Sequence, residues 1–481
     1  MAGASVFLCF LLLALSAASD HNEYQQRYKD YIQSVSNNAT YVSMMKAQEE
    51  HQHHPKVAGS PFPCTVYPAS PTVPTSVHAL RPGDVKVVGA MGDSITAALG
   101  ADASNIFGML TEDRGLSWSI GGDGTYEDQE TLPNILKRYN PEVKGYSVGT
   151  GDKEDKAHLN VADTGSVASD LPRQARVLID RMKNDPEIDM ENDWKVITIM
   201  TGGNDICDVC IDQEAHSPER YIESVTSALD ILQTEVPRVF VNLVETINVE
   251  IAKDLNKGLV CTVLHIACKC AAFPDGEEGE EIVEQTSEGY HSQTEQLVST
   301  GRYDTKDDFT VVVQPFLKET FLPRTPDGEP DFSFFAPDCF HLSRKGHAAA
   351  ANGLWNNMIE PEGSKRVTWA PGEPINCPSE ASPFFFTRKN SNVTEGVMRD
   401  GAPRVVSEEE ISADNRGGSE DHTVVIGTSF IVLAVVGLIL TTLWTLHKRR
   451  QGGANKYQTM DEETLWEKPS CTTRIMKQHS P

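Results

Sequence analysis

Four short, almost continuous apolar runs are spaced along the middle of the chain. They cover residues 85–90, 194–200, 238–244 and 309–313. Runs of this length without polar alternation are typical of parallel strands that are covered on both faces. Because helical patterns separate the runs, the sequence predicts an α/β domain in which helices enclose a parallel sheet.

Two of the separating helices have marked starts. Ser217 is followed by Pro218, so the serine side chain can cap a helix that continues to about Glu235. Ser343 is expected to cap a last helix that contains His347. Residues 261–303, before the last strand, read as an excursion with local disulfides and a charged helix.

The two ends of the chain carry apolar segments of a different kind. Residues 1–19 combine a short apolar run with small residues before a cleavage point, which predicts a signal peptide although no basic residue precedes the run. Residues 423–446 are uncharged and, at about 1.5 Å per residue, long enough to cross a bilayer, which predicts a transmembrane helix. Since the basic residues 447–450 follow directly, the tail 447–481 is expected in the cytosol and the rest outside.

Three further parts are predicted between these ends. Residues 20–80 form a polar, Pro-rich segment, 81–375 a globular domain, and 376–422 an acidic extracellular stalk. The prediction is therefore a single-pass type I protein of the plasma membrane, for example of its apical surface, with the globular domain extracellular.

The formal net charge of −27 limits the partners that the surface suits. So acidic a surface argues against nucleic acid and against tight electrostatic docking on anionic lipid. No protein partner can be inferred from it.

The ten cysteines divide by compartment, since Cys9 falls in the signal peptide and Cys471 in the tail. Up to four disulfides are expected among the other eight, because the compartment is oxidising, but their pairing cannot be read from the sequence. These eight are Cys64, Cys207, Cys210, Cys261, Cys268, Cys270, Cys339 and Cys377. Zinc or a redox site at the closely spaced cysteines is the disfavoured alternative, since no second ligand pair has zinc-like spacing. Asn38 and Asn392 are glycosylation candidates outside the proposed core.

A serine near the start of the domain and an acid–base pair near its end point to hydrolysis. Ser94 follows the first apolar run, and Asp338 lies three residues before His341. His341 could take the proton of Ser94 while Asp338 orients the imidazole ring. Because sites in open parallel sheets form beyond the carboxyl ends of the strands, these residues could share one site.

Donors for a tetrahedral oxyanion are expected from three places. The candidates are the backbone N–H groups of Ser94 and Gly165 and the side-chain amide of Asn204. Asp93 is expected to orient the nucleophile loop by hydrogen bonds, and Asp205 to act as a structural support.

Each of these motifs alone has an ordinary interpretation. Gly-Asp-Ser and Asn-Asp are common turn sequences, and His347 is a competing base that we assign to the last helix. No Gly-x-Ser-x-Gly surrounds Ser94, so the α/β-hydrolase arrangement is excluded. No His-rich set lies near these motifs, so neither a metal nor a cofactor is predicted.

Longer motifs extend the pattern beyond the candidate triad. They are Gly92 to Ala98, Ser119 to Asp123, Leu159 to Ala162, Gly202 to Cys207 and Asp338 to Pro361. Over roughly 60–375 the chain resembles the SGNH (GDSL) hydrolase superfamily and, more closely, its membrane-associated phospholipase B members.

The resemblance implies a three-layer, flavodoxin-like α/β/α fold and a triad of Ser94, Asp338 and His341, with Gly165 and Asn204 as signature residues. It also implies calcium-independent hydrolysis of phospholipid and lysophospholipid esters, as phospholipase A2 and lysophospholipase, through an acyl-enzyme on Ser94. The best-known relatives carry tandem catalytic repeats, whereas this chain has one such unit.

Two alternatives remain at this stage. One is an esterase of the same superfamily that acts on retinyl, acylglycerol or acetyl-glycan esters. The other is an inactive binding or adhesion ectodomain that keeps the fold, against which the complete set of signature residues counts.

Overall fold

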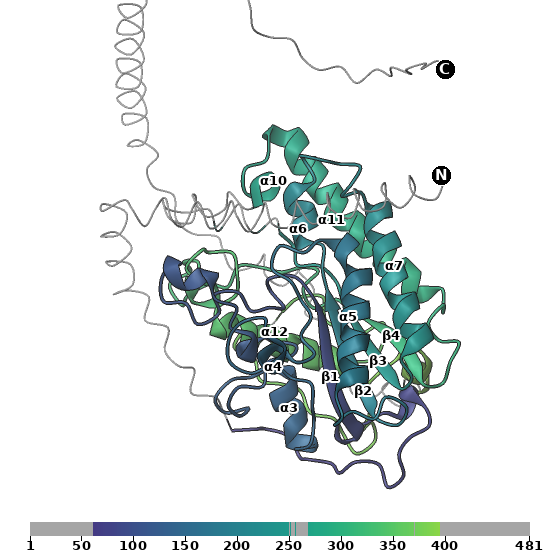
Figure 1. The fold of residues 1–481 in the computed structure, drawn as a ribbon. Coiled ribbons are helices and arrows are strands. Elements are labelled where there is room, and N and C mark those ends of the chain that lie inside the picture. Colours follow the sequence, from purple (N-terminus) through teal and green to yellow (C-terminus); the bar gives the residue numbers. More distant parts are fainter. Residues whose placement is uncertain (1–60, 250, 252–254, 256–267, 370, 395–481) are drawn as a thin grey trace, which may run out of the picture. The chain divides into compact units, whose positions relative to one another are not determined.

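The computed structural model describes residues 61–249, 251, 255, 268–369 and 371–394, all within one compact unit (Figure 1). The predicted signal peptide, transmembrane helix and tail lie outside these residues, as do Asn38 and Cys261. Within the described ranges, none of the helices has both the length and the apolar character needed to cross a bilayer.

Four parallel strands form the central sheet in the order β1-β2-β3-β4. Their bounds are Val85–Gly92 for β1, Trp194–Met200 for β2, Val239–Val244 for β3 and Phe309–Gln314 for β4. Each strand coincides with one of the four apolar runs, so the predicted parallel sheet is confirmed.

The other edge of β1 is also occupied by backbone. Parallel bridges join Val87 to Lys144 and Ala90 to Asn160. The chain therefore visits this edge before it crosses to β2, which creates a switch point beside the carboxyl end of β1. Open α/β sheets form their sites at such points.

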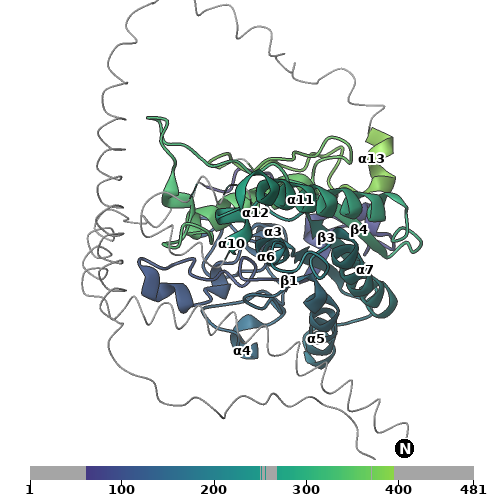
Figure 2. The same ribbon diagram turned by 90° about the horizontal axis from the view of Figure 1, so that it is seen from above.

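Helices cover both faces of the sheet (Figures 1 and 2). One face carries α5 (Leu171–Asn184), α7 (Pro218–Glu235) and α11 (Gly276–Ser299), and the other carries α3 (Leu132–Tyr139) and α12 (Arg344–Met358). Shorter helices are α4 (Glu154–Ala157), α6 (Gly203–Asp208), α10 (Lys269–Ala272) and α13 (Arg388–Thr394). Single 3₁₀ turns are η1 (Val77–Ala79), η2 (Pro82–Asp84), η3 (Ile106–Leu110), η4 (Arg114–Leu116), η5 (Ala168–Asp170) and η7 (Phe332–Phe334).

Side chains that alternate along each strand belong to two separate cores. Ile197 and Ile199 pack with α5 and α7, whereas Val196 and Phe240 pack with α3 and α12. All four side chains are buried. The apolar runs are continuous because both faces of every strand are covered.

The two predicted helix starts are confirmed. The Ser217 hydroxyl accepts from the N–H of Arg220 at the start of α7, which ends at Glu235. The Ser343 hydroxyl accepts from the N–H of Gly346 at the start of α12.

The packed domain continues past both predicted boundaries, residues 81 and 375. Val77, Leu80 and Phe385 are fully buried in the core that α3 and α12 share. A disulfide between Cys64 and Cys377 joins the two flanking segments. Isolated apolar residues in Pro-rich segments show no periodicity, so their burial cannot be read from sequence.

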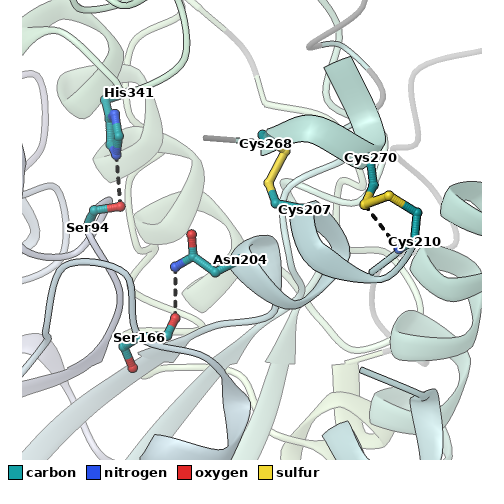
Figure 3. The surroundings of a disulfide bond; sticks show 8 residues. All are labelled: Ser94, Ser166, Asn204, Cys207, Cys210, Cys268, Cys270 and His341. Carbon is teal, nitrogen blue, oxygen red and sulfur yellow. Dashed lines mark hydrogen bonds between the residues drawn. A yellow bond between two sulfur atoms is a disulfide. The ribbon is translucent and has the colours of Figure 1, made fainter. Parts of the chain in front are cut away.

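The disulfides of the excursion before β4 are not local, contrary to the expectation. Cys268 pairs with Cys207 and Cys270 pairs with Cys210, so the two bridges tie α10 to α6 (Figure 3). Cys339 is disulfide-bonded as well. Of the glycosylation candidates, Asn392 falls in α13.

Candidate active site

A sharp turn at the carboxyl end of β1 presents Ser94. Gly92, the last residue of the strand, has φ 152°, and a Cβ there would lie 2.4 Å from the carbonyl oxygen of Met200. Only glycine fits this close approach. The turn places Ser94, which is 4% exposed, directly beyond the strand.

The structure brings Ser94, His341 and Asp338 into one hydrogen-bonded chain. The Ser94 hydroxyl lies 2.8 Å from Nε2 of His341 (Figure 3). Nδ1 of the same ring lies 2.5 Å from a carboxylate oxygen of Asp338. The other Asp338 oxygen accepts from the N–H groups of Phe340 and His341. Residues 247 positions apart in sequence thus have the geometry of a nucleophile, a base and an orienting acid.

The electrostatics suit these roles. Burial by itself would raise the pKa of Asp338, but the neighbouring His341 and the backbone N–H groups hold that pKa below its ordinary value. An ionised Asp338 accepts a hydrogen bond from the N–H of Nδ1. Nε2 then carries no hydrogen and can accept the hydrogen bond of the Ser94 hydroxyl. Cys339, between acid and base, has φ 59°, a conformation that tightens the turn carrying both.

Asn204 and the loop around Gly165 meet beside the serine. Asn204 is the second residue of α6, which begins at Gly203 directly after Gly202, whose φ is 110°. Its Nδ2 donates to the carbonyl oxygen of Ser166 at 2.8 Å, as Figure 3 shows. Gly165, with φ 83°, has a backbone conformation that suits glycine. An amide nitrogen carries two hydrogens, so one remains for a ligand.

Asp93 and Asp205 both shape loops. The Asp93 carboxylate accepts from the N–H of Ile95, and burial raises the pKa of Asp93 to about 6. Asp205 accepts from the N–H of Ala168 at 2.9 Å, which anchors the end of the Gly165 loop. Its other oxygen lies 3.3 Å from Nδ1 of His216, a contact that raises the pKa of His216.

Sequence reasoning missed two buried side chains that hold the site together. Gln174 of α5 hydrogen-bonds the N–H and the carbonyl of Gly92 at 2.8 Å each, and also the Ser166 hydroxyl. Arg114 pairs with Glu112 and donates to the carbonyls of Asn160 and Ala162. Neither side chain falls within a motif, and the bonds of Gln174 to Gly92 and of Arg114 to Asn160 and Ala162 join residues that are distant in sequence.

His347, the competing base, lies in α12 as predicted. It is buried, and its Nδ1 accepts from the N–H of Trp118 at 3.3 Å. Burial lowers the pKa of His347 to about 3. A histidine in this environment stays neutral and belongs to the core.

A mostly apolar pocket opens beside Ser94. Its polar lining comes from Asp93, Ser94, Asn204, Thr246 and Asn248, with the backbone of Gly203. Its apolar lining comes from Ile95, Met200, Ile247, Val249, Ile251, Leu255 and Phe340. A hydroxyl at the wall of an apolar space suits a substrate with a hydrocarbon chain.

Known proteins are similar to this chain over the part that carries the candidate site. The GDSL-like Lipase/Acylhydrolase family matches residues 88–354. Membrane-associated phospholipase B1 of Mus musculus is 47% identical over 349 residues, 70% of this chain and 24% of that protein. The Homo sapiens protein of the same name is 44% identical over 386 residues, 78% of this chain and 26% of that protein.

The chain thus spans about a quarter of the length of the curated relatives that it matches. Among solved structures, phospholipase A1 from Streptomyces albidoflavus NA297 aligns over 56% of this chain and 99% of that one. With 14% identity and a TM-score of 0.25, this likeness is too weak to support a conclusion about the fold or the function of this chain. The family match covers more than half of the chain and includes Ser94, Asp338 and His341, and on that ground the chain belongs to the GDSL-like lipase/acylhydrolase family.

Proposed function

We propose that this chain is a membrane-anchored, calcium-independent serine lipase that hydrolyses the acyl esters of phospholipids and lysophospholipids. The observation that carries the proposal is the Ser94–His341–Asp338 chain at the wall of an apolar cavity. The names of the relatives support the lipid class. A transmembrane helix at 423–446 would hold the domain outside the plasma membrane.

The reaction begins with proton transfer from Ser94 to Nε2 of His341 as Oγ attacks the ester carbonyl carbon. The imidazolium, stabilised by Asp338, then protonates the departing glycerol oxygen, and the carbon–oxygen bond of the ester breaks. Water next attacks the acyl-enzyme while His341 accepts its proton. The fatty acid leaves, and the hydroxyl of Ser94 is restored.

The negative charge of the tetrahedral intermediate needs donors close to Ser94. We assign the backbone N–H groups of Ser94 and Gly165 and the side-chain amide of Asn204 to this role. The contact between Asn204 and Ser166 supports the assignment, because it fixes the amide beside the Gly165 loop before substrate binds. In this assignment protein donors alone stabilise the oxyanion, which agrees with calcium-independent hydrolysis.

A mass-spectrometric product assay tests this function. The full chain is incubated with phosphatidylcholine in EDTA, beside Ser94→Ala and the exposed control Ser292→Ala. We expect fatty acid, lysophosphatidylcholine and then glycerophosphocholine from the wild type and Ser292→Ala only. Product formation by Ser94→Ala, or a requirement for added calcium, would contradict the proposal.

One observation favours a second candidate, an esterase for uncharged lipid esters. Among the described residues that line the cavity, none is a lysine, arginine or histidine that would bind a phosphate. Retinyl and acylglycerol esters would fit such a lining, whereas acetyl-glycan esters would leave its apolar part unused. Faster hydrolysis of diacylglycerol or retinyl ester than of phosphatidylcholine, at equal surface concentration, would favour this candidate.

A further inference from the structure

Large exposed apolar side chains gather in particular segments of the described chain. Seven exceed one third exposure, and five of these belong to segments that follow strands of the sheet. These five are Phe107 at 43%, Leu110 at 45%, Ile211 at 63%, Phe273 at 38% and Phe321 at 47%. The other two, Val66 at 44% and Val73 at 63%, precede the first strand.

The topology places the five residues at one edge of the sheet. Phe107 and Leu110 belong to η3, after β1, and Phe321 follows β4. Ile211 follows α6, after β2, and Phe273 follows α10, which the Cys210–Cys270 bridge holds against α6. Since parallel strands end at the same edge, these segments surround the edge that carries Ser94; Figure 1 shows α6 and α10 there.

Contacts tie these segments to the candidate site. Met109 of η3 belongs to one small buried cluster with Ala103 and Ala336, and Ala336 lies two residues before Asp338. Near the loop that carries Phe321, the carbonyl of Leu317 accepts from the N–H of Asn248, a residue of the cavity wall. The segments that carry Phe107, Leu110 and Phe321 are thus packed next to residues of the candidate site.

The charges on the same segments are almost all negative. Residues 102–110, 210–214, 269–280 and 319–329 expose ten acidic side chains and two basic ones. The acidic ones are Asp102, Asp212, Glu214, Asp275, Glu277, Glu278, Glu280, Glu319, Asp327 and Glu329, and the basic ones are Lys269 and Arg324. We call these ten acidic side chains the acidic rim. The acidic rim repels anionic lipid and complements the trimethylammonium group of a choline headgroup.

We propose that this docking face, defined by Phe107, Leu110, Ile211, Phe273 and Phe321, seats the domain on a lipid surface rich in choline headgroups. The apolar side chains enter the boundary between headgroups and acyl chains, and the acidic side chains meet the ammonium groups. The face thereby brings an ester from the surface to the cavity without exposing its acyl chain to water. The choice of lipid rests on the function proposed above.

Kinetics in mixed micelles give the first test. The full chain in nonionic detergent receives phosphatidylcholine at low mole fraction or a soluble short-chain ester. Phe107→Ser/Ile211→Ser is compared with Val66→Ser/Val73→Ser, whose residues have nearly the same exposure. We expect the first pair to hydrolyse phosphatidylcholine about tenfold more slowly and the soluble ester within about twofold of wild type. The control pair should change neither rate.

Equal losses in the two pairs would overturn the proposal. A loss on both substrates with a lower midpoint of thermal unfolding would also overturn it, because the face would then be covered by the chain itself. Lipid-free light scattering that shows a dimer broken by the first pair would instead assign the face to a second copy.

Fluorescence quenching separates docking from hydrolysis. In a Ser94→Ala background, Phe107→Trp and Val73→Trp are mixed with vesicles of brominated phosphatidylcholine. Extra quenching is expected for Phe107→Trp only, and it should fall when phosphatidylserine replaces half of the lipid. If Phe107→Trp is quenched but the wild type does not hydrolyse phosphatidylcholine, the docking face stands and the proposed substrate is wrong. If the wild type hydrolyses phosphatidylcholine but Phe107→Trp shows no extra quenching, the proposed substrate stands and the docking face is wrong.

Discussion

At the scale of the residue, the orientation of one imidazole ring decides whether Ser94 can react. The 2.5 Å contact between Nδ1 of His341 and Asp338 keeps the hydrogen on that nitrogen, so Nε2 faces the serine hydroxyl as an acceptor. His347 lies in α12, where burial lowers its pKa and its Nδ1 accepts from the N–H of Trp118. Two histidines close in sequence thus differ in chemistry because their surroundings differ.

The Asp338→Asn variant tests this orientation. Asparagine would donate to Nδ1 and favour the wrong tautomer, so we expect kcat to fall by about 10³–10⁴ with little change in KM. Asp180→Asn, at an exposed position of α5, serves as the control. A decrease of less than about tenfold, measured by ester hydrolysis at neutral pH, would show that Asp338 is not needed to orient the base.

At the scale of the element, α6 connects the site to the disulfide pair. The helix carries Asn204 in its first turn and Cys207 near its end, and the next turn carries Cys210. Each cysteine is bound to α10, so a short helix that could not be stable alone is held in place. The position of the Asn204 amide depends on this helix.

Removal of the outer bridge in Cys210→Ser/Cys270→Ser should lower stability more than activity. Chain entropy gives about 4 kcal/mol in the free energy of unfolding for a lone bridge with a sequence separation of 60, but the retained Cys207–Cys268 bridge already closes nearly the same loop, so the loss should stay well below that value. We expect a lower midpoint of thermal unfolding and a nearly unchanged kcat at low temperature, since the Cys207–Cys268 bridge still anchors α6. A large loss of kcat in a protein that unfolds at the wild-type temperature would contradict this.

At the scale of the whole molecule, buried carboxyl groups make stability depend on pH. Burial raises the pKa of Asp93 and Asp113 to about 6 and that of Glu245 to about 8. Glu245 follows β3, directly before the loop that lines the cavity, and neither carboxyl oxygen has a hydrogen-bond partner among the described residues. A carboxyl group in such a place favours the protonated form in the folded state.

Glu245→Gln is therefore expected to stabilise the protein at high pH. The unfolded state ionises near pH 4.3, so the stability that protonated Glu245 contributes is present below that pH and is lost as pH rises to about 8. The thermal midpoint of Glu245→Gln should exceed that of wild type at pH 8 and approach it at pH 5. Glu142→Gln, on the surface, is the control; equal midpoints of wild type and Glu245→Gln at pH 8 would refute the prediction.

Local signals in the sequence are enough to predict the strands, two helix starts and the three members of the candidate triad. Continuous apolar runs depend only on neighbours along the chain, and so do Ser217 and Ser343 as caps. The triad could be inferred because Ser94 and Asp338 each stand in a recognisable motif beside a strand end or turn.

The sequence by itself therefore determined the fold class and the identity of the candidate reacting groups. Only the tertiary structure decided the domain boundaries, the pairing of Cys207 and Cys210 with α10, the supports from Gln174 and Arg114, and the apolar cavity with its rim. The reason is that each of these features joins residues far apart in sequence. Their contact depends on how the layers pack, and no local pattern records that packing.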